Sequence, residues 1–312
     1  MNLVLATDTG SDTDPLPATF EAPTYRSLWP DLAALDDKAL RLHYEQFGAD
    51  EGRLANSLVS REEFAGLIPA DADALEIGPF CKPLLRGPRT KYFDVMDKPA
   101  LEQRARGIGL PEAVAPQIDY ISAVGDLAVV DMSFDYVLSS HCIEHQPDLI
   151  GHLQQVSRIL RPNGRYLMLV PDKRFCFDAL LAESTIAEVL DAHHSGRKTH
   201  SLRSVIEHRV LTTHNDCLRH WQGDHGSLQD KDASRLLASI QEFNAANGGY
   251  VDVHAWYFTP RSINSLFGLL GEAGYIDFSV ERLYPTRLNS IEFWMVLRKP
   301  SKSAVNVGSD KQ

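Results

Sequence analysis

The segment LEIGPF, from Leu75 to Phe80, decides the fold of this chain. Its first residues suit a short buried strand, and Gly78 follows that strand directly. A glycine at this place lets the backbone turn tightly and lets a ligand approach where a Cβ atom would obstruct it. The segment therefore predicts a buried strand with a ligand-binding loop at its carboxyl end.

Strand-like and helix-like segments alternate after LEIGPF. A helix is expected from Leu149 to Leu160, because its apolar residues have helical spacing and Arg161-Pro162-Asn163-Gly164 ends it. Further strands are expected in KYFDVMD (91–97), QIDYIS (117–122), FDYVLSS (134–140), RYLMLVP (165–171), IDFSVERLY (276–284) and IEFWMVLRK (291–299). This alternation predicts an α/β fold with a Rossmann-like, doubly wound, mostly parallel sheet. In such sheets the ligand binds at the carboxyl ends of the strands.

The rest of the chain divides by composition and periodicity. Residues 1–22 and 301–312 lack periodicity and are expected to be a disordered arm and tail. Residues 23–72 predict a helical appendage, and 73–300 form the main domain, with 176–250 inserted as a helical cap. In the appendage, Asp36 is placed to cap a helix and Gly48 to end it. The helix would present one face made of Leu40, His43, Tyr44 and Phe47.

Composition narrows the possible partners and the cellular location. The net charge of -11 argues against non-specific binding to nucleic acid, because a negative surface repels phosphates. Four widely spaced cysteines suit reduced thiols, and no apolar run approaches the roughly 20 residues that span a bilayer. We therefore expect a cytoplasmic protein with no membrane span and no nucleic-acid partner.

The loops after the first three strands predict the cofactor. LEIGPF lacks the second and third glycines of a dinucleotide fingerprint, with Phe80 at the second place, which favours a cofactor without phosphates. Asp94 ends the second strand and can accept hydrogen bonds from both hydroxyls of a ribose, with Asp97 as the alternative. In the third crossover, Asp126 can accept from an adenine amine while Leu127 covers the ring, although Gly-Asp is also a common turn pair.

The fourth strand continues into His141-Cys142-Ile143-Glu144-His145, which matches the H-x-x-E-H motif of some zinc proteases. That chemistry needs the motif inside a helix. Here the motif begins directly after a strand, and Pro147 follows two residues later, so a loop is predicted and a zinc hydrolase is disfavoured. The cap is rich in histidine, but no pair there has compelling ligand spacing, so no metal is predicted.

The ordered motifs LEIGP, FDVMD, VGDLA, FDYVLSSHCIEHQPD and LRPNGRYLMLVPDK resemble those of class I S-adenosylmethionine-dependent methyltransferases of the type 11 group. The resemblance implies S-adenosylmethionine as the cofactor. It also implies cofactor roles for Glu76, Gly78, Pro79, Asp94, Asp126, Leu127, Ser140 and His141. Phe80 departs from the family, which usually has glycine there, and leaves less room near the methionine end of the cofactor.

Methyl transfer needs a positioned acceptor and, for a hydroxyl, a base that takes the proton. The candidates for this base are His141, His145, His254 and Asp172. Trp221, Trp256 and Tyr257 would stack on a sugar or fill the core. The stretch YRSLWPDLAALDDKALRLHYEQFGADEGR resembles a module found beside bacterial surface-polysaccharide enzymes, so a sugar or glycan acceptor is expected. The alternatives are a secondary-metabolite acceptor and a catalytically silent, cofactor-binding scaffold.

Overall fold

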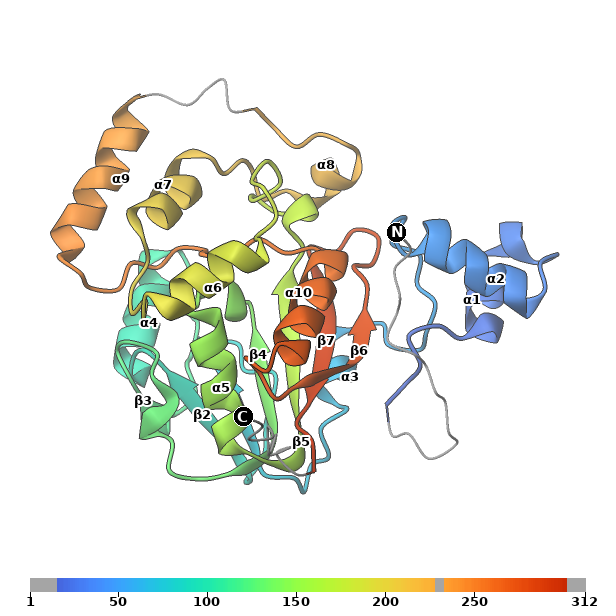
Figure 1. The fold of residues 1–312 in the computed structure, drawn as a ribbon, viewed down its shortest axis with the longest axis horizontal. Helices are drawn as coiled ribbons and strands as arrows, with labels where there is room; N and C mark the ends of the chain where they lie inside the picture. The colour runs from blue at the N-terminus through green and yellow to red at the C-terminus, as the bar shows by residue number, and fades with distance from the viewer. Residues whose placement is uncertain (1–15, 228–232, 302–312) are drawn as a thin grey trace, which may run out of the picture.

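The computed structural model describes residues 16–227 and 233–301. Seven strands form one sheet in the order β3-β2-β1-β4-β5-β7-β6, and β7 alone among them runs antiparallel to the others (Figure 1). The strands are β1 (Ala74–Ile77), β2 (Thr90–Asp94), β3 (Tyr120–Ile121), β4 (Phe134–Ser140), β5 (Leu160–Pro171), β6 (Ser279–Tyr284) and β7 (Glu292–Arg298). The predicted α/β fold with a doubly wound, mostly parallel sheet is confirmed.

The strand β5 begins earlier than the sequence predicts. Leu160 pairs with Phe134 of β4, and the register then shifts before Arg165 pairs with Tyr136. Asn163 has a φ of 64°, so the chain still makes the expected turn between these two pairs. The preceding helix, α5 (Leu149–Ile159), ends where Pro162 would interrupt it.

Side chains alternate along β5 and supply both faces of the sheet. Tyr166, Met168 and Val170 pack in the larger core with residues of α5 and of α10 (Pro260–Glu272). Leu167 and Leu169 point to the opposite face and pack in the smaller core. Burial on both faces explains why this strand is apolar at almost every position.

Four helices lie over the carboxyl ends of the parallel strands (Figure 1). They are α6 (Ile186–His194), α7 (Leu202–Val210), α8 (Cys217–Trp221) and α9 (Ala233–Ala246). All four lie within residues 176–250, which the sequence predicts as an inserted helical cap. The sequence did not predict α8, which has five residues and depends on its Asp216 cap. The cap brings segments far apart in sequence over one edge of the sheet.

The N-terminal appendage contains α1 (Ala22–Leu28) and α2 (Asp37–His43), followed by a π-helical turn (Tyr44–Gly48). Asp36 caps α2 as predicted, accepting from the backbone N–H of Ala39 at 2.8 Å. Leu40 and Tyr44 are buried, but Phe47 is 54% exposed. The prediction that Phe47 shares their face is wrong, because the π turn takes more residues per turn than an α-helix.

The boundary between appendage and domain differs from the predicted one. The helix α3 (Arg61–Ala65), expected in the appendage, packs on the sheet, where Phe64 stacks on Trp294 with 5.1 Å between ring centroids. Leu16 and Phe20, expected in the arm, are buried. The remaining arm and tail, 1–15 and 302–312, lie outside the described residues. In the ranges that are described, no helix is both long and apolar enough for a membrane span.

Candidate active site

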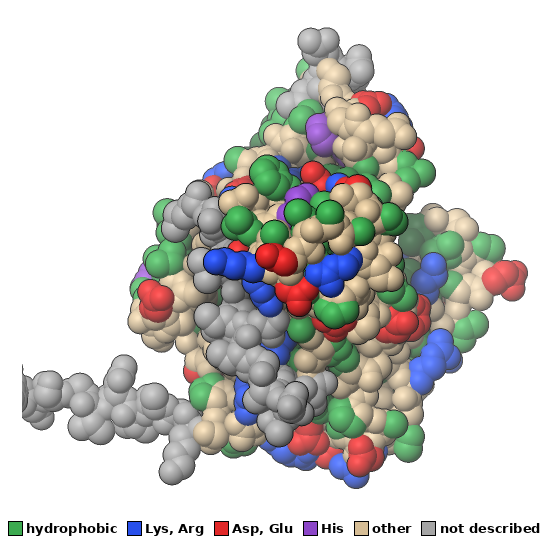
Figure 2. Space-filling model, turned by 90° about the vertical axis from the view of Figure 1, so that its right-hand side faces the viewer, with side chains coloured by type: hydrophobic (Ala, Val, Ile, Leu, Met, Phe, Trp, Pro, Cys, Tyr) green, Lys and Arg blue, Asp and Glu red, His purple; other side chains and the backbone are tan. Residues whose placement is uncertain are grey.

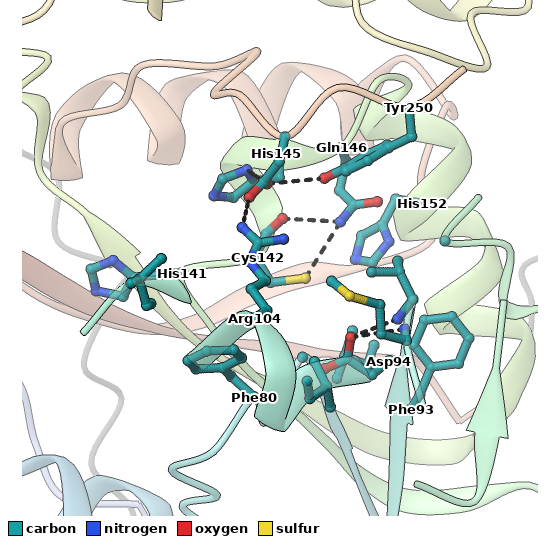
Figure 3. Close-up of a pocket in the computed structure, with 18 residues that line it drawn as sticks. Phe80, Phe93, Asp94, Arg104, His141, Cys142, His145, Gln146, His152 and Tyr250 are labelled. Carbon is teal, nitrogen blue, oxygen red and sulfur yellow. Dashed lines mark hydrogen bonds and ion pairs between the residues drawn. The ribbon is translucent and has the colours of Figure 1, made fainter. Parts of the chain in front are cut away.

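A cavity of about 270 Å³ lies at the carboxyl ends of β1, β2 and β4 (Figure 3). Gly78, which follows β1, has a φ of 70°, a left-handed conformation that glycine adopts without strain. Phe80 also has a positive φ, 47°, and its side chain lines the cavity. Phe80 therefore keeps the left-handed backbone that glycine would adopt, while its ring occupies space in the site.

Asp94, the last residue of β2, also lines the cavity and is buried. Its Oδ1 accepts hydrogen bonds from the backbone N–H groups of Val95 at 2.7 Å and Met96 at 3.3 Å. Burial raises the pKa of Asp94, and these donors offset part of that effect. The loop thus fixes the Asp94 carboxylate in the cavity wall.

Several residues that the sequence assigned to the cofactor do not line this cavity. Glu76 accepts from the backbone N–H groups of Leu84 at 2.9 Å and Leu85 at 2.8 Å, so it stabilises the loop after β1. Burial raises the pKa of Glu76 to about 7. The other residues placed outside the cavity wall are Pro79, Asp126, Leu127 and Ser140.

The third crossover contributes Gly125 to the cavity rather than its neighbours. Asp126 caps a short turn by accepting from the N–H of Ala128 at 2.8 Å. Leu127 is fully buried in the larger core. Both side chains therefore have structural partners, and an adenine would meet the backbone of this loop first.

His141 lines the cavity from the turn after β4. Its φ of 50° is uncommon for a residue other than glycine, and backbone conformations of this kind cluster at active sites. Its Nε2 lies 2.6 Å from Oε2 of Glu292, the first residue of β7. Burial alone would raise the pKa of Glu292, but Arg61 and His141 outweigh it and lower this pKa to about 2.

His145 and Asp252 form a second pair on the cavity wall. Nδ1 of His145 lies 3.1 Å from Oδ1 of Asp252, which also pairs with Arg104 of α4 (Lys98–Gly107) (Figure 3). Burial acts to lower the pKa of His145, but the nearby carboxylates outweigh it and the pKa is raised. The neighbouring His145 and Arg104 outweigh burial and hold the pKa of Asp252 well below its usual range.

The other two candidate bases lie away from the cavity wall. His254 is buried, with Nδ1 at 2.6 Å from Oδ2 of Asp178. Asp172 is fully buried and accepts from the Oγ1 of Thr286 at 2.6 Å and from Arg174. Of the four candidates, His141 and His145 therefore border the cavity.

None of the three aromatic candidates lines the cavity. Trp256 and Tyr257 are buried, and Trp221 stacks on Phe175 with 3.6 Å between ring centroids. Sequence reasoning missed several residues of the cavity wall, namely Cys142, His152, Arg104, Tyr250 and Asp252. No local motif marks the last three, because α4 and the segment before α10 meet only in the folded chain.

The H-x-x-E-H pentad forms a loop, as predicted. Ile143–His145 is a single 3₁₀ turn directly after β4. His141 and His145 therefore do not share one face of an α-helix, as the zinc-protease motif requires.

A family model described as a methyltransferase domain matches residues 46–271, which is most of the chain. The chain belongs to this methyltransferase family. The predicted resemblance, the enzyme class and the cofactor S-adenosylmethionine are confirmed. A search of curated proteins finds no match.

Solved structures that resemble this methyltransferase do so weakly. An S-adenosylmethionine-dependent methyltransferase from Mesorhizobium loti has 16% identity and a TM-score of 0.37 over 76% of this chain and 96% of its own. One from Clostridium acetobutylicum has 9% identity and a TM-score of 0.40 over 85% and 98%. The mitomycin 7-O-methyltransferase has 14% identity and a TM-score of 0.36 over 86% of this chain, which spans only 60% of that protein. At sequence identities and TM-scores this low, the structural similarities give no information about the methyl acceptor.

The cavity fits a cofactor that carries a ribose but no phosphate. Asp94 is placed for the ribose hydroxyls, and Phe80, Met96 and Leu101 offer apolar contacts. Among the residues that line the cavity, Arg104 is the single lysine or arginine, and Asp252 already pairs with it. A pyrophosphate would find no free cation on this wall, whereas S-adenosylmethionine carries one carboxylate together with a positive ammonium and a positive sulfonium.

Proposed function

We propose that this methyltransferase transfers the methyl group to a hydroxyl oxygen of a sugar-containing acceptor, with His141 as the general base. The proposal is based on the position of His141 between two cavities. It lines the cofactor cavity, and it hydrogen-bonds to Glu292, which lines a second groove of about 830 Å³. A base at this junction can reach both the methyl donor and an acceptor lying in the groove.

The groove suits a polar acceptor with a negative charge. Arg287 lies in its wall, with its guanidinium 4.1 Å from the centre of the Trp294 ring. In the described part of the chain no carboxylate pairs directly with Arg287, and burial lowers its pKa. An anionic group of the acceptor would therefore relieve the cost of this half-buried cation.

The N-terminal appendage supplies part of the groove. Trp29 and Gly52 line it, and the carbonyl of Gly52 accepts from the backbone N–H of Leu288 at 2.8 Å. These residues belong to the segment that resembles a module beside surface-polysaccharide enzymes. This origin of the groove supports a glycan intermediate as the acceptor.

The proposed chemistry follows from the pairing of His141. The bound cofactor supplies an electrophilic methyl carbon. In the tautomer in which Nε2 of His141 donates to Glu292, the base is Nδ1, which lies 4.0 Å from Oε1 of Glu144 and would take the proton of the acceptor hydroxyl. Glu292 then stabilises the imidazolium that forms, and Arg61 in turn holds Glu292 ionised.

Transfer of a labelled methyl group to a panel of acceptors tests this proposal. The panel contains nucleotide sugars, sugar phosphates, neutral sugars and small phenols. We expect transfer to a charged sugar, a fall in kcat of about 100-fold or more for His141→Gln, and a raised KM for Arg287→Ala. His193→Gln, which alters a histidine–carboxylate pair outside the site, is the matched control.

Binding of S-adenosylhomocysteine separates the possible failures. Unchanged binding with no transfer to any acceptor would favour the silent scaffold, and transfer only to phenols would favour a secondary-metabolite acceptor. Full activity of His141→Gln on a sugar would overturn the assignment of the base.

A further inference from the structure

Glu144 is a buried carboxylate without hydrogen-bond partners. It has no exposed area, and neither carboxylate oxygen accepts a hydrogen bond from the described residues. Other buried carboxylates of this chain, such as Glu76 and Asp172, have two or more donors. A buried carboxyl group left unpaired costs several kcal/mol, so a missing partner is the natural explanation.

Three histidines have a ring nitrogen near the same oxygen of Glu144. Nε2 of His145 and Nε2 of His254 each lie 3.9 Å from Oε1 of Glu144, and Nδ1 of His141 lies 4.0 Å from it. Of these residues, Glu144, His145 and His254 each offer a ligand atom within 4.8 Å of the others. This spacing is too long for a direct hydrogen bond but leaves room for an ion between them.

Each histidine has a carboxylate near its other nitrogen. Nδ1 of His254 hydrogen-bonds to Asp178 at 2.6 Å, whereas Nδ1 of His145 lies at ion-pair distance from Asp252, 3.1 Å, without a hydrogen bond. A proton on Nδ1 of His254 leaves its Nε2 with a free lone pair. Carboxylate–histidine pairs of this kind orient the ligands of metal sites and raise their basicity.

We propose that Glu144, His145 and His254 bind one divalent transition-metal ion of the zinc type. Zinc bonds of 2.0–2.1 Å in a tetrahedron separate the ligand atoms by about 3.4 Å, so the two oxygen–nitrogen separations of 3.9 Å must each shorten by about 0.5 Å. The ion neutralises Glu144 together with its two neighbouring carboxylates. Two histidines and one carboxylate leave a coordination position open.

The site is distinct from the zinc-protease motif and departs from the metal-free site that the sequence predicts. Glu144 is a ligand here rather than a base, and His254 joins it from more than a hundred residues along the chain. A second group, Asp178, His208 and His254, also has ligand spacing. There, however, Asp178 is already bound to His254, which leaves the group around Glu144 as the stronger candidate.

An ion at this place would tie the end of the cap to the sheet. The backbone N–H of Ala255 donates to the carbonyl of Glu144 at 2.7 Å, so the two segments already meet. His145 also lines the cofactor cavity. The ion would therefore lie in the cavity wall, between the turn after β4 and the segment that leads to α10.

Titration of the untagged, chelator-treated full chain with Co²⁺ and Zn²⁺ tests the site. We expect one ion per chain by calorimetry, and visible absorption bands of Co²⁺ in a four- or five-coordinate nitrogen–oxygen site. Glu144→Gln and His254→Gln should weaken binding at least 100-fold. Asp178→Asn, which changes only the orienting carboxylate, should weaken it 10- to 100-fold.

His193→Gln is the control, because it alters a histidine–carboxylate pair that lies outside the cluster and should leave the titration unchanged. Binding of S-adenosylhomocysteine checks that each variant is folded. If the wild-type chain binds no stoichiometric ion, the cluster is a network of protonated histidines around Glu144 and the proposal is overturned. Binding that Glu144→Gln and His254→Gln leave intact would overturn it equally.

Discussion

Asp94→Asn is the sharpest test of the cofactor site. Asparagine keeps a carbonyl oxygen that can accept from the N–H groups of Val95 and Met96, so the loop after β2 should persist. The substitution removes the charge and turns the second acceptor oxygen into a donor. The change therefore acts on the ligand rather than on the fold.

The magnitude follows from the hydrogen bonds to the ribose. A hydrogen bond to a charged group contributes about 1.5–3 kcal/mol, so losing this interaction should weaken S-adenosylhomocysteine binding by about 10- to 150-fold. Calorimetry at constant pH measures this difference. Urea unfolding of the same variant should show little change in stability.

Asp97→Asn is the matched control. Asp97 caps α4 by accepting from the N–H of Ala100 at 2.9 Å and does not line the cavity. Asparagine also caps helices well, so this variant should keep both affinity and stability. Equal affinity of wild type and Asp94→Asn, or an equal loss in both variants, would refute the ribose role of Asp94.

Three further predictions concern the backbone, the pH dependence and the core. Gly78→Ala should lower the free energy of unfolding by about 1–2 kcal/mol, because the φ of 70° at this position is unfavourable for alanine. An unchanged midpoint of urea unfolding would show that alanine causes no backbone strain at this position. Burial lowers the pKa of His152 to about 4 from 6.5, so stability should be full above pH 6.5 and fall by about 3 kcal/mol towards pH 4. His152→Gln should remove that part of the slope in urea unfolding measured between pH 4 and 7, and an identical slope would exclude His152 as its cause. Leu153→Ala, on the buried face of α5, should lower the free energy of unfolding in urea by about 2–5 kcal/mol. Leu269→Ala, on the exposed side of α10, should lower it by less than about 0.5 kcal/mol. Similar losses in both variants would mean that Leu153 is not the core residue its burial indicates.

The surface around the groove shows why the acceptor was harder to predict than the cofactor. Figure 2, turned to show the side of the appendage, presents lysine and arginine side chains interspersed with aspartate and glutamate rather than one uniform charge. A net charge of -11 therefore does not describe the groove, where Arg61 and Arg287 lie. Local charge depends on which loops meet, and composition cannot report it.

The sequence by itself determined the sheet and the part of the site that Gly78 and Asp94 form. Apolar runs such as ALEI and FDYVLSS predicted their strands because both faces of a parallel strand are buried, and Gly78 and Asp94 follow strands that lie next to each other. Carboxyl ends of parallel strands meet at one edge, so these two residues could be brought together without knowing the rest of the fold.

Only the tertiary structure decided which other groups face the cavity and which serve the scaffold. Glu76, Asp126 and Leu127 follow the family pattern, yet backbone donors or the core occupy them. Arg104 and Asp252 meet across 148 positions of sequence, and Glu144 meets His254 across a similar span. Strands can be predicted because their pattern is a local periodicity of the sequence. The contacts Arg104–Asp252 and Glu144–His254 instead depend on where the chain returns from the cap to the sheet, and no local sequence pattern encodes that place.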